Sequence, residues 1–239
     1  MPAFSDPKED HTALVKTNHT MKQRLLIVGA NDFGREVLCW ALQIPEDVRP
    51  WTIGGFLDNR PEILEGYNMP YSIIGAPESY EFQEQDRMVV AVGNPAQRKK
   101  YVEMIASRGG QFTSVIHPSV IMGLSNRWGE GCIFCPGVII TTNAVIGDHV
   151  VFNCRSGAGH DAVIGSYCTL SGAVDITGHV KLGEGVMLGS HASVTPYSIV
   201  GDYAVIGAGS VVLRKVLPYT TVMGVPAREV WKANPPPLP

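Results

Sequence analysis

Residues 116–217 carry a six-residue repeat, which constrains the fold more than any other feature of the chain. Counted from Ile116, the first residue of all seventeen blocks is apolar, and the register is unbroken. The fifth residue is small or Val in sixteen of the seventeen blocks, and Asn126 is the exception. The second residue is often Gly, as at Gly159 and Gly165. A pattern this regular indicates a repeat architecture.

A period of six fits neither an α-helix, with about 3.6 residues per turn, nor a flat strand, with a period of about 2. It fits a coil of three short strands in which one large and one small side chain per strand fill a triangular interior. Hexapeptide repeats of this kind predict a parallel β-helix, with glycines where a corner needs positive φ or close packing. Since three blocks make a coil, residue n should lie beside residue n+18, roughly 4.8 Å away.

Composition and charge exclude several classes of function. The net charge is −3 and no long basic run occurs, so the chain lacks the electrostatic signature of a protein that binds nucleic acid or an anionic membrane. No apolar run is long enough to cross a bilayer, and the first twenty residues lack the apolar block of a secretory signal. We therefore expect a cytoplasmic protein with no nucleic-acid or membrane partner.

The five cysteines point to packing rather than to metal or disulfide chemistry. Cys132 and Cys168 occupy fifth positions of the repeat, where Cys acts as a small apolar filler. Cys132 and Cys135 are spaced like half of a zinc knuckle, but no second half follows. This usage suits a reducing compartment, and we expect no bound metal.

Residues 22–112 show a different pattern, in which strands alternate with helices. Apolar runs at 24–28, 52–57 and 88–92 are typical of buried parallel strands, and helices are expected at 35–43 and 95–107. The predicted organisation is a tail at 1–21, a Rossmann-like domain at 22–112, a β-helix at 113–217, and a closing segment with a disordered tail at 218–239. We expect the segment from Pro218 to leave the coil and to cover its exposed strand edges.

Ligands of such parallel sheets bind beyond the carboxyl ends of the strands. Those ends carry Gly29 to Gly34, then Asp58, then Gly93 and Asn94. The spacing of Gly29 and Gly34 is only part of a dinucleotide fingerprint, so a tight turn without a ligand is an open alternative. Asp58 could contact a ribose or a base edge, or it could cap a turn.

The coil period also predicts a chemical cluster in the β-helix. His160 should stack between Thr142 and Gly178, and Asp161 should lie beside His179. A carboxylate next to an imidazole can fix its tautomer and stabilise the imidazolium, as general-base catalysis needs. Gly178 could offer a backbone N–H to an oxyanion. The alternative is that these outward histidines are simply solvated, and for His149 and His191 we favour that interpretation.

Several motifs together resemble the sialic acid O-acetyltransferase family, whose bacterial members acetylate UDP-amino-sugars and GDP-perosamine. The resemblance covers about residues 22–231 and rests on Leu26 to Ala30 with Arg35 to Val37, Gly55 to Asp58, Val92 to Asn94 with Arg98, Val115 to Ser119, Asn153 with His160 and Asp161, and Gly224 to Ala227.

The resemblance implies an acetyl-CoA-dependent sugar N- or O-acetyltransferase of cell-surface polysaccharide biosynthesis. It implies a nucleotide-sugar-binding Rossmann-like domain, a left-handed β-helix that forms a homotrimer, and acetyl-CoA between subunits. The family's catalytic histidine and acid match His160 and Asp161, and its glycine beside the thioester matches Gly178. The n+18 column places CoA along Gly178, Pro196 and Arg214, with Arg214 and Lys215 at its phosphates or merely solvated. The expected substrate contacts are Gly29, Asn31, Asp58, Gly93, Asn94, Arg98, Asn153 and His179.

The chain departs from the family pattern in its first loop, which here includes Asn31 and Asp32. The Asp32 carboxylate would repel a diphosphate. Two other functions therefore stay open: a non-catalytic nucleotide-sugar-binding scaffold, and a trimeric metal-dependent enzyme resembling carbonic anhydrase. The second would use His149, His179 and His191, although the n+18 map places none of them beside another.

Overall fold

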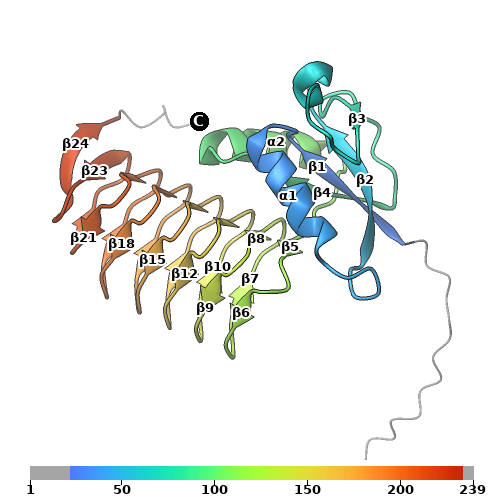
Figure 1. Cartoon of the computed structure of the whole chain (residues 1–239). Coiled ribbons are helices and arrows are strands. Elements are labelled where there is room, and N and C mark those ends of the chain that lie inside the picture. Colours follow the sequence, from blue (N-terminus) through green and yellow to red (C-terminus); the bar gives the residue numbers. More distant parts are fainter. Residues whose placement is uncertain (1–21, 234–239) are drawn as a thin grey trace, which may run out of the picture.

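The computed structural model describes residues 22–233, which form an α/β part followed by a long triangular coil (Figure 1). Expectations for a tail at 1–21 and for disorder at 234–239 lie outside the described residues. The α/β part contains a four-stranded parallel sheet of order β3-β2-β1-β4. Its elements are β1 (Gln23–Val28), α1 (Asp32–Leu42), β2 (Trp51–Leu57), the 3-10 helix η1 (Pro61–Leu64), β3 (Ile73–Gly75), β4 (Asp86–Val90) and α2 (Pro95–Ser107).

The two helices cover opposite faces of this sheet. Leu25 and Ile27 of β1 pack in the cluster that includes α1, whereas Leu26 and Val28 pack in the cluster that includes α2. Because both faces are covered, the strands are continuously apolar, as predicted. The sequence did not predict β3, since a three-residue edge strand has too few side chains to show a period. Helix α1 also begins three residues earlier than predicted, at Asp32.

The coil is a parallel β-helix whose two-residue strands form three sheets. Paired positions are 18 residues apart, as predicted: Val151 pairs with Thr169, and Ala158 pairs with Ile176. The strands are β5 (Val115–Ile116), β6 (Ile121–Met122), β7 (Arg127–Trp128), β8 (Ile133–Phe134), β9 (Ile139–Ile140), β10 (Val145–Ile146), β11 (Val151–Phe152), β12 (Gly157–Ala158), β13 (Val163–Ile164), β14 (Thr169–Leu170), β15 (Asp175–Ile176), β16 (Lys181–Leu182), β17 (Met187–Leu188), β18 (Ser193–Val194), β19 (Ile199–Val200), β20 (Val205–Ile206), β21 (Val211–Val212), β22 (Lys215–Val216), β23 (Thr220–Met223) and β24 (Arg228–Lys232).

The first and fifth residues of the repeat fill the coil interior, as the sequence predicts. Phe134 and Leu170 are fully buried examples of the first position, and Cys132 and Cys168 are fully buried at the fifth. The first coil is the exception, because it has a neighbouring coil on one side only. Trp128 there remains 41% exposed.

The frequent second-position glycines are explained by close packing rather than by positive φ. Positive φ falls on the fourth residue of the blocks, as at Asp161 (φ 58°) and His179 (φ 60°). A Cβ added at Gly159 would lie 2.6 Å from the backbone nitrogen of Gly178 on the next coil. The two alternatives left open by the sequence are therefore resolved in favour of contact between coils.

The expectation that the chain leaves the coil at Pro218 is wrong. The corner between β21 and β22 is two residues shorter, so Val200 pairs with Val216 and Ile206 pairs with Val222, an offset of 16 residues. Strand β23 thus continues the coil, and only then does β24 return antiparallel along the edge of β23 (Figure 1). The six-residue blocks predicted from the sequence continue through the shortened corner, because apolar side chains recur there too, and so they hide the change in offset.

The three sheets of the coil face different surroundings. The sheet that contains β5, β8 and β11 packs against the α/β part through Val115, Ile133 and Val151, in the same cluster as α1. The other two sheets carry exposed aliphatic side chains, among them Ile139 and Val163. Two of the three long sides are thus uncovered in the single chain.

Candidate functional site

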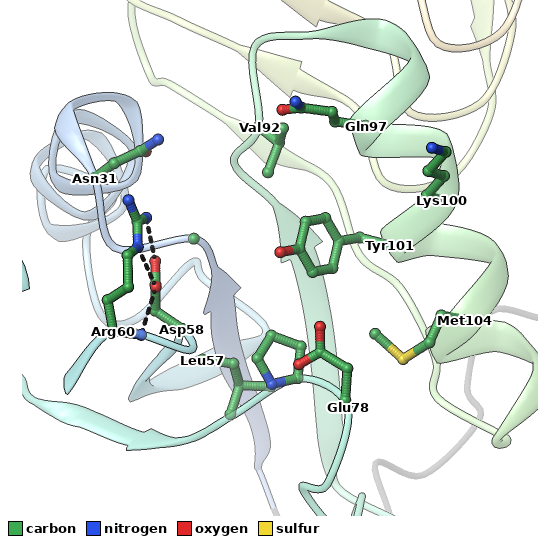
Figure 2. Close-up of a pocket in the computed structure, with 12 residues that line it drawn as sticks. Asn31, Leu57, Asp58, Arg60, Glu78, Val92, Gln97, Lys100, Tyr101 and Met104 are labelled. Carbon is green, nitrogen blue, oxygen red and sulfur yellow. Dashed lines mark hydrogen bonds and ion pairs between the residues drawn. The ribbon is translucent and has the colours of Figure 1, made fainter.

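A cavity of about 600 Å³ opens at the carboxyl ends of β1, β2 and β4 (Figure 2). This is where the topology of a parallel sheet predicts a ligand site. Of the predicted substrate contacts, Gly29, Asn31 and Asp58 line it. The other lining residues are Leu57, Arg60, Pro77, Glu78, Val92, Gln97, Lys100, Tyr101 and Met104.

Asp58 supports the loop after β1. It is 7% exposed, and its carboxylate accepts hydrogen bonds from the Ala30 N–H (2.8 Å) and from the backbone and side chain of Arg60 (3.0–3.1 Å). Burial alone would raise the pKa of Asp58, but these hydrogen bonds outweigh it and lower the pKa. Beside it, the buried Oδ1 of Asn31 has no hydrogen-bond partner among the described residues.

Sequence reasoning missed the opposite wall of the cavity, which belongs to α2. Gln97, Lys100, Tyr101 and Met104 all face the cavity (Figure 2). Their spacing of i, i+3, i+4 and i+7 puts them on one helical face. That spacing could have shown from the sequence that the four side chains share a face. It could not show that this face lines a cavity, because the face mixes polar and apolar side chains.

Asp32, which the sequence suggested would repel a diphosphate, does not line this cavity. Its side chain is 92% exposed, forms an ion pair with Arg35 and is absent from the cavity wall. The departure from the family loop therefore brings only Asn31 to the site.

Arg98 is not available to a substrate, which corrects its expected role. Its side chain is fully buried and donates hydrogen bonds to backbone oxygens of the α/β part, Val92 and Gly93, and of the coil. Its coil acceptors are the backbone oxygens of His149, Tyr167 and Cys168 and the hydroxyl of Thr169. Burial lowers the pKa of this guanidinium to about 10. Arg98 thus fastens α2 to the coil.

The other predicted contacts near α2 also have structural roles. The Asn94 side chain accepts a hydrogen bond from the Gln97 N–H (3.0 Å) and caps α2. The Gly93 carbonyl accepts from the Thr169 hydroxyl at 2.8 Å. Neither Gly93 nor Asn94 lines the cavity. Asn153 lies at a different corner of the coil from His160, where its Oδ1 accepts from the Cys154 N–H (2.7 Å).

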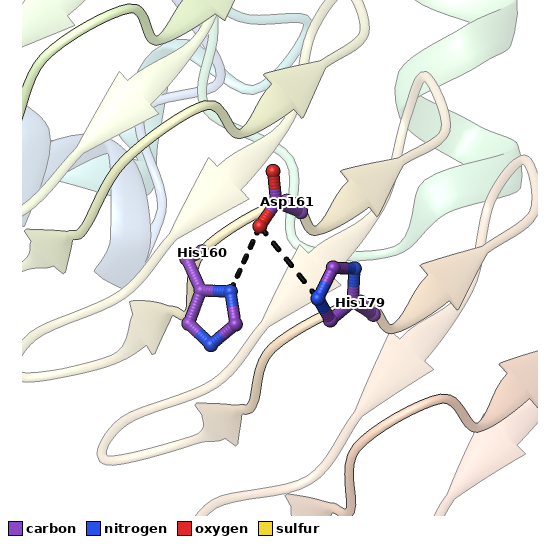
Figure 3. Close-up of side chains that lie close together, drawn as sticks. All are labelled: His160, Asp161 and His179. Atoms are coloured by element: carbon purple, nitrogen blue, oxygen red, sulfur yellow. Dashed lines mark hydrogen bonds and ion pairs between the residues drawn. The ribbon is translucent and has the colours of Figure 1, made fainter.

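The predicted cluster on the coil is present (Figure 3). His160 Nδ1 lies 2.8 Å from Asp161 Oδ2, and His179 Nε2 lies 3.7 Å from the same oxygen. The two imidazoles meet edge to face, with ring centroids 5.0 Å apart. The hydrogen bond from His160, with the charge of His179 and a contact from Asn143, lowers the pKa of Asp161. A carboxylate held in this way fixes the His160 ring and leaves Nε2 as its reactive nitrogen.

Gly178 lies directly against that free nitrogen. A Cβ added at Gly178 would lie 2.5 Å from His160 Nε2. The Gly178 N–H donates no hydrogen bond to the described residues. A free backbone N–H beside a general base is the arrangement used to stabilise an oxyanion.

The same cluster has the composition of a metal site. Within residues 22–233, His160, Asp161 and His179 form the group of ligands whose coordinating atoms all lie within 4.8 Å of one another. The carbonic anhydrase-like alternative used His149 instead. That imidazole is 2% exposed and packed between Phe112 and Tyr167, so it cannot share a surface metal with His179 and His191.

The predicted CoA column holds only in part. Tyr197, next to Pro196, donates its N–H to the Gly178 carbonyl at 3.3 Å, so these coils are adjacent. Beyond Val212 the shortened corner ends the offset of 18, so Arg214 does not follow Pro196 in register. Arg214 and Lys215 instead line a cavity of about 540 Å³ at the end of the coil, together with Arg228.

Comparison with known proteins places both parts of the chain. Residues 24–105 match the PglD N-terminal domain, and residues 179–214 match the bacterial transferase hexapeptide (six repeats). One curated relative is GDP-perosamine N-acetyltransferase of Escherichia coli O157:H7, 34% identical over 93 residues, or 39% of this chain and 42% of that protein. Another is an acyl-[acyl-carrier-protein]–UDP-N-acetylglucosamine O-acyltransferase of Pseudomonas entomophila, 28% identical over 109 residues. The matches span about two fifths of the length of these relatives.

Solved structures match over most of the chain. PerB from Caulobacter crescentus, in complex with CoA and GDP-perosamine, has a TM-score of 0.77 and 28% identity over 86% of this chain and 96% of its own. The acetyltransferase domain of PglB from Neisseria gonorrhoeae has a TM-score of 0.79 and 26% identity over 87% and 100%. These matches confirm the resemblance to sugar acetyltransferases and the left-handed parallel β-helix that it implied. Within the described residues, no helix is both long enough and apolar enough to span a bilayer.

Proposed function

We propose that this chain, a PglD N-terminal domain joined to a β-helix of hexapeptide repeats, transfers an acetyl group from acetyl-CoA to an amino or hydroxyl group of a nucleotide-activated sugar. The observation that carries the proposal is the corner at His160. There an imidazole fixed by Asp161 presents Nε2 over the Gly178 N–H, which donates to no acceptor within residues 22–233. The cavity at the sheet edge supplies the place for the nucleotide.

In this mechanism His160 Nε2 takes the proton of the acceptor as the acceptor attacks the thioester carbonyl. Asp161 accepts the Nδ1–H and stabilises the imidazolium that forms. The Gly178 N–H stabilises the tetrahedral oxyanion. When this intermediate collapses, the C–S bond breaks and the imidazolium returns its proton to the leaving thiolate, which gives the acetylated sugar and free CoA. His179 faces the same carboxylate and is positioned to contact the substrate.

We propose that the CoA phosphates lie against Arg214 and Lys215 and that the functional unit is a homotrimer. Both basic side chains are exposed at the end of the coil, beside a cavity. His160 lies at the corner between β12 and β13, which belong to the two sheets that the α/β part leaves uncovered. A neighbouring subunit on these sheets would enclose the base. We place the reaction in the cytoplasm, where five free thiols suit the reducing conditions.

The test is acetyl-CoA-dependent thiol release with a panel of GDP-, UDP- and CMP-linked amino sugars. His160→Ala should lower kcat by about 10²–10⁴-fold, the typical contribution of a general base, while CoA affinity is retained. His191→Ala is the control, since His191 is another exposed histidine of the coil and lies outside the cluster of His160, Asp161 and His179. Arg214→Ala should weaken CoA binding and leave nucleotide binding unchanged.

Unchanged turnover in His160→Ala would reject the mechanism. Binding of a nucleotide sugar with no thiol release from any acceptor would favour the scaffold alternative instead. Both outcomes can be read in the same preparation.

A further inference from the structure

The cavity at the sheet edge has two chemically different ends (Figure 2). Asn31 and Gln97 lie at one end, and Glu78 and Met104 lie at the other, with the lining residue Pro77 next to Glu78 in the chain. Arg60 and Tyr101 project into the space between them. The first end carries amide side chains, whereas the second combines apolar surface with one carboxylate. A nucleotide has matching parts, because its diphosphate needs donors and cations while its base needs flat apolar contacts and polar atoms at its edge.

The cations suit the diphosphate. The Arg60 guanidinium lies beside Asp58 at 3.0 Å and is still 53% exposed. Lys100 is exposed and has no ion-pair partner within residues 22–233. Guanidinium and ammonium groups are the usual protein partners of phosphate oxygens. A diphosphate between these side chains leaves the base to the end that contains Glu78 and Met104, next to the Tyr101 ring.

The carboxylate at that end is held in place from outside the cavity. Asn59 Nδ2 donates a hydrogen bond to Glu78 Oε1 at 2.9 Å. Asn59 itself is not among the lining residues, so it supports Glu78 from behind. A carboxylate has about four acceptor positions and offers no donor when ionised. Glu78 can therefore receive two further hydrogen bonds from a ligand, but it repels a ligand that presents acceptors.

Only one common base presents two adjacent donors on its Watson–Crick edge. Guanine offers N1–H and N2–H₂ side by side, which match the two oxygens of a carboxylate. Uracil has a single N3–H between two carbonyl oxygens, and in adenine and cytosine the amino group lies next to a ring acceptor. Among the common bases, guanine therefore has the Watson–Crick edge that best matches a carboxylate.

We infer that this cavity selects a guanine nucleotide, with Glu78 on the base edge and Arg60 and Lys100 on the diphosphate. The inference deepens the proposed function, since it names the nucleotide that carries the sugar. Asn59 is a positioning residue in this arrangement, and Glu78 determines specificity.

The experiment is calorimetric titration of the full chain, without CoA, with GDP, IDP and UDP. Inosine keeps the N1–H and lacks the N2 amino group, so it isolates one of the two hydrogen bonds. GDP should bind at least about tenfold more tightly than UDP, with IDP between them, since losing one hydrogen bond to a charged group weakens binding by about tenfold or more. Glu78→Gln should remove most of the difference between GDP and IDP, and Asn59→Ala should reduce the ratio of GDP to UDP affinity.

Glu84→Gln is the matched control, because Glu84 is an exposed glutamate outside the cavity, and it should leave all three affinities unchanged. UDP binding as tight as GDP binding, or a ratio insensitive to Glu78→Gln, would overturn the inference. Turnover of a UDP-sugar but not a GDP-sugar would likewise overturn it while the acetyltransferase proposal stands. Selective, Glu78-dependent GDP binding without thiol release would support this inference and reject the acetyltransferase proposal.

Discussion

At the scale of single residues, the space above Gly178 determines where the His160 ring can lie. The backbone at Gly178 does not have positive φ, so alanine is compatible with its conformation. The added methyl would nevertheless stand 2.5 Å from His160 Nε2, and real Cβ atoms do not approach so closely. The imidazole would have to rotate or shift away from the position that Asp161 holds.

We therefore predict that Gly178→Ala lowers kcat by roughly 10²-fold, within the contribution of a general base, while the melting temperature stays within a few degrees of the wild type. Steady-state thiol release and thermal unfolding measure the two quantities. Gly172→Ala is the control at the same position of the neighbouring block, because a Cβ there meets only the Cys154 carbonyl at an ordinary 3.6 Å. Equal loss of kcat in both variants would show that the effect is not steric at His160.

This cluster could be predicted because the repeat converts sequence distance into contact. A period of six in a three-sided coil makes residues 18 apart neighbours, and His160, Gly178 and His179 needed no further information. The approach failed for Arg214, where the corner is shorter by two residues. Apolar periodicity did not reveal the shorter corner, because Val216 fits the apolar fifth position of the predicted block although it pairs with Val200.

At the scale of secondary-structure elements, the most consequential contact is Arg98 of α2 on the coil. Six hydrogen bonds end on its guanidinium, and four of their acceptors belong to coil residues. Without the guanidinium these oxygens would stay buried without donors, a loss of about 1–3 kcal/mol for each one that cannot rearrange.

We predict that Arg98→Met lowers the free energy of unfolding by at least about 3 kcal/mol, as measured by urea denaturation. Lys100→Met on the same helix should change it by less than about 0.5 kcal/mol, because Lys100 is exposed. Equal stability of the two variants would contradict the role assigned to Arg98. The family resemblance singled out Arg98 but assigned it to the substrate, because burial of a cation depends on which carbonyls the coil brings to it.

The corner that receives Arg98 also contains a buried imidazole. His149 lies between Phe112 and Tyr167, and burial lowers its pKa to about 4. In the unfolded chain this group takes up a proton near its ordinary pKa of 6.5. Above pH 6.5 the imidazole is neutral in both the folded and the unfolded chain, so its protonation does not affect stability. As the pH falls from 6.5 towards 4, only the unfolded chain takes up the proton, and the free energy of unfolding decreases.

We predict that His149→Phe reduces the loss of unfolding free energy between pH 7 and pH 4.5 by about 2–3 kcal/mol. An aromatic ring fits the position, because Tyr167 adopts the same positive φ one coil further. Urea denaturation at the two pH values measures the difference. His191→Phe, at an exposed position, should keep the wild-type pH dependence of the free energy of unfolding. The same wild-type pH dependence in His149→Phe would contradict the prediction.

At the scale of the whole molecule, two long sides of the coil are uncovered in the single chain. Ile139 is 49% exposed and Val163 is 40% exposed, on two sheets that meet at the corner of His160. Flat aliphatic faces of this kind are usually buried in an assembly. In a cyclic trimer each subunit would use both faces against different neighbours.

We predict that light scattering after size-exclusion chromatography gives the wild type three times the mass of a single chain. Ile139→Glu or Val163→Glu should reduce this to the mass of one chain. Each change would place a carboxylate in an apolar contact. Ile74→Glu, 38% exposed on the edge of the α/β sheet, should keep the trimer. A monomeric wild type with full activity would contradict the trimeric site.

The anchoring of α2 has a further consequence for how such proteins can diversify. The coil segments that receive Arg98 run from His149 to Thr169, and His160 lies within that stretch. Any whole coil inserted or deleted after residue 182 would lengthen or shorten the rod by about one 4.8 Å layer, yet the base and the nucleotide cavity would keep their separation. If the proposed sites are right, evolution can change the distance from His160 to the CoA end of the coil without moving the nucleotide cavity.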